Sequence, residues 1–186
     1  SMDLFEYKND PMASTKHIPL AEKMRPKSLA DFIGQEHLVG KDAPLNKLLT
    51  KDQLHSMILW GPPGTGKTTL AHLIAKSSQK KFHFFSAVLQ GLSDLRKLID
   101  QSIQDQKYYD KASVIFIDEI HRFNKSQQDA LLPYVENGSF TLIGATTENP
   151  SFELIAPLLS RSMVFTLKPL SADHLGLMID RTLKSM

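Results

Sequence analysis

Short, mostly apolar runs recur along the chain and predict the strands of a buried sheet. Five such runs, rich in β-branched and aromatic residues and without polar alternation, cover residues 57–60, 82–85, 114–117, 140–143 and 164–167. Continuous apolar runs of this length are typical of strands covered on both faces by other elements. We therefore expect five strands, each of them buried on both faces.

Segments with apolar residues at a helical period separate these runs. They cover residues 68–78, 92–106 and 126–135, with a shorter helix near 44–49 and Pro133 loosening the last turn of the third. Strands that alternate with helices favour a mostly parallel sheet with helices on both faces. The pattern predicts an α/β fold, a three-layer sandwich around a central five-stranded sheet.

The pattern changes toward both ends of the chain. Residues 1–19 mix charged residues, Asn and Pro with little periodicity, and we expect a flexible segment there. Residues 20–170 form the expected core, and residues 171–186 read as a capped helix whose apolar stripe has little left to pack against. Ser1 before Met2 resembles the remnant of a cleaved tag, and the chain stops inside this helix, so we expect an excised fragment.

Composition narrows the class of protein. The 186 residues suit one domain, and no cysteine is present, which excludes disulfides, thiolate metal sites and a cysteine nucleophile. A net charge of +2 predicts no dedicated basic face for nucleic acid. No apolar run approaches the ~18 residues of a membrane span, and the start of the chain lacks the features of a secretory signal. We expect no membrane partner and a cytoplasmic location.

One motif predicts phosphate binding. The string Gly61-Pro62-Pro63-Gly64-Thr65-Gly66-Lys67-Thr68 fits G-x-x-x-x-G-K-[ST] and lies between a predicted strand and a predicted helix. Its glycines let consecutive backbone N–H groups face one anion, and the helix N-terminus adds partial positive charge. We expect Lys67 to reach the β- and γ-phosphates of ATP, Thr68 to place its hydroxyl on Mg²⁺, and Thr69 to complete the nucleotide-binding set.

Two carboxylates follow the third apolar run. At the carboxyl end of a parallel strand, Asp118 can hold Mg²⁺ opposite Thr68, and Glu119 can orient or deprotonate the attacking water. A solvated acidic turn is the alternative, which the spacing from the phosphate motif disfavours. His121 follows closely. We interpret it as a structural or hydrogen-bonding residue, because no cluster of further metal ligands accompanies it.

Two further segments stay open on pattern alone. The polar string 144–150 after the fourth run either faces the γ-phosphate or caps the next helix. Arg161 is either a solvated surface residue or a group that stabilises the transition state on a neighbouring subunit's nucleotide. Lysines cluster at two helix ends, which is typical of solvated faces near a helix C-terminus, so we assign no DNA-contacting residue.

Taken together, these motifs resemble those of the AAA+ ATPases. More narrowly, the chain is similar to the replication-associated recombination protein A family, the bacterial relatives of Werner-helicase-interacting protein. The strings that carry this resemblance lie at residues 19–21, 25–26, 33–38, 55–64, 120–130 and 143–154. Those at 120–130 and 143–154 are far more specific than the phosphate motif.

The resemblance implies roles for individual residues. Residues 61–68 look like Walker A, Asp118 with Glu119 like Walker B, and Thr147 sits at the sensor 1 position. Arg161 occupies the arginine-finger position, which acts on ATP held by the adjacent subunit. The segment that lines the adenine corresponds to Arg25, Pro26, Ile33 and Gly34. Ser86 is implied to touch Glu119 and hold it inactive until DNA engages.

The resemblance also implies a function. Family members are homo-oligomeric, DNA-stimulated ATPases that act in replication-fork maintenance, recombination and repair, with replication and single-strand-binding proteins as candidate partners. Residues 171–186 would be the first helix of a truncated lid domain. The alternatives are a clamp-loader or branch-migration subunit, a nucleotide-gated scaffold without turnover, which Glu119 disfavours, and a two-domain helicase, for which the chain is too short.

Overall fold

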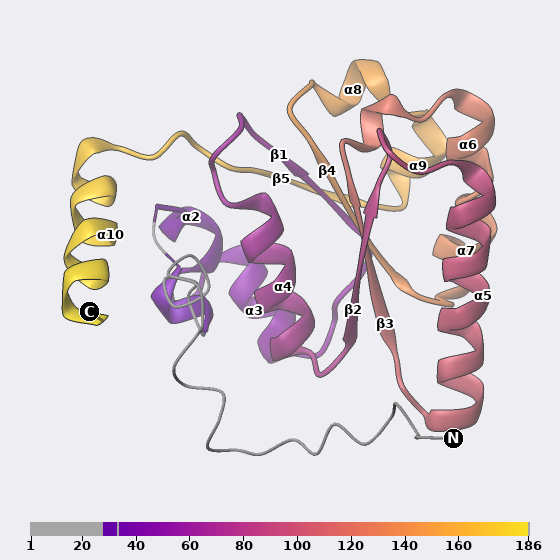
Figure 1. The fold of residues 1–186 in the computed structure, drawn as a ribbon, viewed down its shortest axis with the longest axis horizontal. Coiled ribbons are helices and arrows are strands. Elements are labelled where there is room, and N and C mark those ends of the chain that lie inside the picture. Colours follow the sequence, from indigo (N-terminus) through magenta and orange to yellow (C-terminus); the bar gives the residue numbers. More distant parts are fainter. Residues whose placement is uncertain (1–27, 33, 186) are drawn as a thin grey trace, which may run out of the picture.

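The computed structural model describes residues 28–32 and 34–185, built around one parallel sheet (Figure 1). Its five strands run in the spatial order β2-β3-β4-β1-β5. Their bounds are β1 Met57–Trp60, β2 Lys81–Ser86, β3 Ser113–Asp118, β4 Thr141–Thr146 and β5 Met163–Thr166. All four pairings are parallel, which confirms the predicted α/β fold with a central five-stranded sheet.

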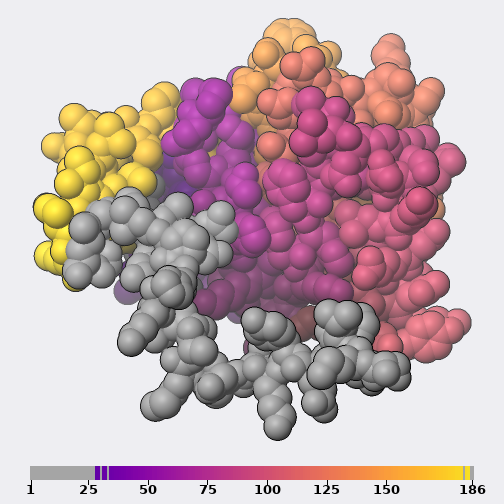
Figure 2. All heavy atoms as spheres, in the orientation of Figure 1, coloured from indigo at the N-terminus to yellow at the C-terminus, as the bar shows by residue number. Residues whose placement is uncertain are grey.

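Helices cover both faces of the sheet and make three layers (Figure 1). One face carries η1 Leu29–Asp31, α2 Glu36–Val39, α3 Pro44–Thr50 and α4 Lys67–Ser77. The other carries α5 Leu92–Tyr109, η2 Ile120–Arg122, α6 Lys125–Asp129, α7 Leu132–Asn137, α8 Pro150–Glu153 and α9 Ala156–Ser160. Helix α10, Ala172–Ser185, lies at one end of the molecule (Figure 2), where Arg181 donates to the Asp31 carbonyl and Nε2 of His174 lies 3.6 Å from Oε1 of Glu36.

Each face of the sheet has its own apolar core. Along β4, Ile143 and Ala145 belong to the core beneath α4, whereas Leu142 belongs to the core beneath α5 and α9. This alternation follows from the two-residue period of a strand. The expectation of burial on both faces holds for β1, β3 and β4 but is wrong for β2 and β5. These two strands form the edges of the sheet, so part of each remains exposed.

The third predicted helix, 126–135, is two helices in the structure, and this expectation is corrected. Helix α6 ends at Asp129, and Pro133 lies in the first turn of α7, where a missing N–H costs nothing. A buried Gln128 then ties α6 to the following helices. Its side chain donates to the carbonyls of Phe123 and Glu153, both at 3.0 Å, and accepts from the Ile155 amide at 2.8 Å.

The fourth strand runs further than its apolar residues indicate. The sequence predicts a strand over 140–143, but β4 continues through Gly144, Ala145 and Thr146. These three residues pair with Ile58, Leu59 and Trp60 of β1 and are buried, so they are part of the sheet rather than a polar loop. Among the described residues, no helix is long and apolar enough to cross a bilayer.

Candidate active site

A cavity of about 340 Å³ opens at the carboxyl edge of the sheet. It brings three predicted motifs together, and its lining residues are Pro63, Gly64, Gly66, Lys67, Thr68, Thr69, Asp118, Glu119, Ala145, Thr146 and Thr147. They come from the loop after β1, the start of α4 and the ends of β3 and β4. Because parallel strands end at the same edge, groups far apart in the sequence meet here.

The loop between β1 and α4 takes its shape from its own residues. Gly66 has φ of 93°, and a Cβ there would come 2.8 Å from Cζ of Phe32, whose ring lies against the glycine. Gly64 also has a positive φ, of 79°. The Thr65 hydroxyl donates to the Pro62 carbonyl at 2.9 Å. The loop is therefore shaped by glycine conformations and an internal hydrogen bond before any anion arrives.

The Lys67 ammonium is folded back onto the same loop. Its Nζ donates to the carbonyls of Gly61 at 2.6 Å and Pro62 at 2.9 Å. Burial lowers the pKa of Lys67, and the nearby Asp118 carboxylate opposes that effect. A partly desolvated ammonium group is stabilised more strongly by an anion than by the neutral carbonyls that it contacts in the loop. This arrangement fits a phosphate group in the cavity.

The cavity also offers oxygen ligands of the kind that Mg²⁺ prefers. Thr68 contributes a hydroxyl and Asp118 a carboxylate to the same lining. In the described part of the chain, no group of three or more His, Cys, Asp and Glu side chains could hold a metal ion. These two side chains fit Mg²⁺ bound together with substrate phosphates, since this ion commonly uses one or two carboxylates plus phosphate oxygens.

Glu119 follows β3 in a conformation that few residues adopt. Its φ of 53° and ψ of 47° lie in the left-handed region, where the backbone of any residue other than glycine is strained. Its Oε2 lies 3.8 Å from Nε of Arg122. The implied contact with Ser86 is not seen among the described hydrogen bonds; the Ser86 hydroxyl accepts instead from the Leu89 amide at 3.2 Å.

The end of β4 brings two threonines to the cavity, although the sequence singled out only one. Thr147 lines it as expected. Thr146 is 1% exposed, and its Oγ1 lies 2.9 Å from Nδ1 of His121. This contact confirms the hydrogen-bonding interpretation of His121. The doubled threonine was the only signal for Thr146 in the sequence, and it did not identify the partner.

Arg161 lies at the amino ends of the strands, opposite the carboxyl ends at which the cavity opens. It is not among the residues that line the cavity. It precedes β5, whose first residue Met163 pairs with Met57, the first residue of β1, whereas the phosphate loop follows the last residue of β1. Its Nε forms an ion pair with Glu136 at 2.8 Å, and its Nη1 donates to the Pro157 carbonyl at 2.9 Å. Arg161 therefore does not reach the cavity of its own chain.

The residues implied for adenine binding fall largely outside the described part of the chain, since Arg25, Pro26 and Ile33 are not described. Gly34 is described, with φ of 93°, and a Cβ there would clash with the Leu170 side chain. The next residue, Gln35, was missed by sequence reasoning. It is fully buried, and its Nε2 donates to the carbonyl of Lys168 at 2.8 Å and to that of Thr65 at 3.4 Å.

The fold and this site define an ATPase of a known family. The chain belongs to the ATPase family associated with various cellular activities, AAA, whose family model matches residues 57–170. This assignment confirms the expected resemblance to AAA+ ATPases, and the predicted three-layer α/β sandwich is the fold of the P-loop NTPases.

Particular relatives narrow the resemblance. The chain is 52% identical to replication-associated recombination protein A of Coxiella burnetii over 168 residues, covering 90% of this chain and 38% of that protein. It is 50% identical to ATPase WRNIP1 of Dictyostelium discoideum over 166 residues, 89% of this chain and 19% of that one. The chain thus spans well under half of these relatives.

A solved structure shares the fold. The RuvB Holliday junction branch migration motor of Thermotoga maritima superimposes with a TM-score of 0.67 and 36% identity, covering 86% of this chain and 53% of that one. The similarity to replication-associated recombination protein A, expected from the strings at 120–130 and 143–154, is confirmed.

Proposed function

We propose that this chain is the ATP-binding and ATP-hydrolysing core of a DNA-dependent ATPase that acts in replication-fork maintenance, recombination and repair in the cytoplasm. One observation carries the proposal: the phosphate loop, the pair Asp118–Glu119 and Thr147 line a single cavity. The names of the relatives support the cellular process, and the AAA family supports ATP as the substrate.

In this proposal the loop residues bind the triphosphate. Backbone N–H groups of residues 64–67 and the start of α4 face the phosphates, and Lys67 exchanges two carbonyl partners for phosphate oxygens. Thr68 and Asp118 would hold Mg²⁺, which neutralises charge on the phosphates. Arg25, Pro26, Ile33 and Gly34 are proposed to line the adenine.

Glu119 and Thr147 act on the γ-phosphate. Glu119 accepts a proton from the attacking water as the water oxygen bonds to the γ-phosphorus, and the bond to the β–γ bridging oxygen breaks, so that ADP leaves with the electron pair. The Thr147 hydroxyl donates to a γ-phosphate oxygen. Their shared position on the cavity wall supports these roles.

The proposed assembly is a homo-oligomer in which Arg161 serves the nucleotide of the adjacent copy. Its position at the edge opposite its own cavity, already oriented by Glu136, supports that role. Residues 20–170 would be the AAA+ core and α10 the first helix of a lid domain. DNA at forks or gaps, and replication or single-strand-binding proteins, are the proposed partners. A branch-migration motor is the second candidate, favoured by the likeness to RuvB.

The replacement Glu119→Gln tests the catalytic part of this proposal. We expect ATP affinity within about threefold of the original chain and a turnover at least about 10²-fold lower, because a general base contributes about 10²–10⁴-fold. Titration calorimetry and phosphate release, with and without gapped duplex DNA, provide the two measurements. Glu153→Gln, on the exposed side of α8, is the matched control. Turnover is measured in the full-length protein, which contains the whole lid domain. Undiminished turnover would exclude Glu119 as the base, and ATP binding without turnover by the full-length protein would favour the scaffold.

A further inference from the structure

The turn formed by Glu119 and η2 packs against the carboxyl end of β4. Leu142, Gly144 and Thr146 share one face of this strand, because side chains alternate. Ile120 of η2, which is fully buried, packs onto this face at Gly144, where a Cβ would lie 3.0 Å from Cδ1 of Ile120. The missing side chain at Gly144 lets the turn approach closely.

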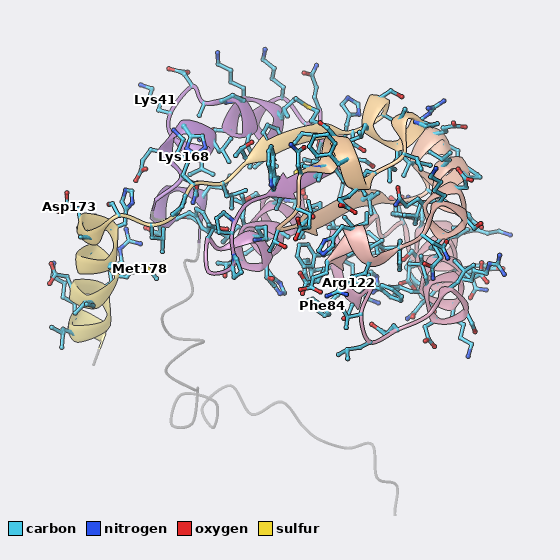
Figure 3. All side chains as sticks on the ribbon, turned by 90° about the horizontal axis from the view of Figure 1, so that it is seen from above. Lys41, Phe84, Arg122, Lys168, Asp173 and Met178 are labelled. Atoms are coloured by element: carbon cyan, nitrogen blue, oxygen red, sulfur yellow. The ribbon has the colours of Figure 1, made fainter. Side chains whose placement is uncertain are left out.

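One residue further along, the same turn forms a hydrogen bond to the same face. His121 meets Thr146, the next residue of β4 on that face after Gly144, with Nδ1 and Oγ1 2.9 Å apart. The turn is therefore attached to β4 at two consecutive points, one apolar and one polar. Arg122 completes the turn at the surface of the molecule (Figure 3).

The partners of Thr146 determine which nitrogen of His121 carries the proton. The Thr146 hydroxyl donates its single proton to the Glu148 carbonyl at 3.2 Å and accepts from the Glu148 amide at 3.0 Å. With the hydroxyl proton directed to the Glu148 carbonyl, the hydrogen-bond pattern assigns Nδ1 of His121 as the donor, a tautomer that the NMR experiment below tests. Neutral His121 is then protonated at Nδ1 and bare at Nε2.

We propose that His121 is a positioning residue that couples the end of β4 to the catalytic carboxylate. The proposal rests on the proposed function, in which Thr147 contacts the γ-phosphate and Glu119 activates water. Thr146 is the residue before Thr147, and Glu119 begins the turn that contains His121. A displacement of the β4 end by γ-phosphate passes through the hydrogen bond between His121 and Thr146 and reorients Glu119.

The other contacts of Glu119 are too weak to fix the orientation of its carboxylate, so the turn must do so. The Glu119 side chain is 40% exposed, and its Oε2 lies 3.8 Å from Nε of Arg122, whose side chain is 63% exposed. An exposed ion pair at that distance holds a side chain weakly. The backbone of Glu119 is left-handed, a conformation that persists only where the surroundings enforce it. The packing of η2 against β4 enforces this conformation. The hydrogen bond of His121 to Thr146 is the polar part of that contact, and the packing of Ile120 is the apolar part.

Imidazole ¹⁵N NMR spectra test the coupling without requiring turnover. In spectra of the neutral imidazole we expect His121 as the Nδ1–H form, assigned by its loss in His121→Asn. Its Nδ1 shift should change with Mg²⁺ and a nonhydrolysable ATP analogue but not with Mg²⁺ and ADP. An Nε2–H form, or equal shifts with both nucleotides, overturns the proposal.

Side-chain replacements provide the second test. Asn places an amide donor near the position of Nδ1, whereas Gln places one near Nε2 and Ala provides none. We expect His121→Ala and His121→Gln to lower kcat by about 10–100-fold, as small misplacements of catalytic groups do, with KM within about threefold, and His121→Asn to retain most activity. Equal losses in all three variants would show a merely structural role.

A second histidine serves as the matched control. His83 on the edge strand β2 forms a similar contact with the Ser113 hydroxyl at 3.3 Å, remote from the cavity lining. His83→Ala should leave kcat unchanged, and a loss as large as that of His121→Ala overturns the proposal. If the original chain binds no nucleotide, the proposed function fails, while the Nδ1–H form still tests the hydrogen bond.

Discussion

Replacing Lys67 by Met separates the chemistry of the phosphate loop from its fold. Met keeps an unbranched side chain only one atom shorter than that of Lys and removes the charge and the donors. In the structure these donors already form two hydrogen bonds, at 2.6 Å and 2.9 Å, to carbonyls of the loop. Phosphate oxygens can take the place of both carbonyls, so the replacement removes two hydrogen bonds from a charged donor to ATP.

The size of the effect follows from those two bonds. Hydrogen bonds to charged groups contribute about 1.5–3 kcal/mol each, so the loss is about 3–6 kcal/mol, or about 10²–10⁴-fold in Kd. The fold itself should suffer little. Burial lowers the pKa of Lys67, which means that folding disfavours its charged form, and Met removes that penalty along with the two bonds to carbonyls.

Titration calorimetry with Mg²⁺ and ATP measures the change, and Lys80→Met provides the control. Lys80 also has a pKa lowered by burial, and its Nζ donates to the Thr141 hydroxyl at 2.8 Å at the other edge of the sheet. We expect its replacement to leave ATP affinity within about twofold. A Lys67→Met chain that binds ATP within threefold of the original, or an equal loss in Lys80→Met, would refute the reasoning.

Three other outcomes follow from the site and its surroundings. Because burial lowers the pKa of Lys67, ATP affinity should begin to fall with rising pH earlier than for an exposed lysine, and calorimetry across pH 7–10 should show no such fall in Lys67→Met. Arg161→Ala should leave the chain's ATP affinity within about twofold by the same titration, while turnover in an assembled oligomer falls about 10³–10⁵-fold. Gln128→Leu leaves two carbonyls and one amide without partners and should cost about 2–4 kcal/mol in urea unfolding.

The sheet and the phosphate loop were predictable because their signals are local. Short, mostly apolar runs identify the strands, although they did not reveal that β2 and β5 are partly exposed edges, and glycine spacing identifies the loop. The break between α6 and α7 was harder to predict. Pro133 disfavours a helix interior but is favoured in a first turn, and we expected it to loosen the last turn of one helix, whereas it begins a second one.

The supporting residues of the site were not predictable, because they act across the fold. Gln35 joins Thr65 to Lys168, and His121 joins η2 to Thr146, each through a hydrogen bond between distant segments. A polar residue carries no local signal of such a partner. Gly144 is the same case, since the reason for its small size is Ile120, which the chain brings near only when the sheet forms.

The placement of Arg161 has a consequence for symmetry. The arginine and the cavity occupy opposite edges of one sheet, so a copy that offered Arg161 to a neighbour would present a different surface from the one it receives. Such a contact is heterologous, and a two-fold dimer cannot satisfy it. Repetition of one rotation would either close the copies into a ring or continue as an open helix, in which one terminal cavity lacks an arginine.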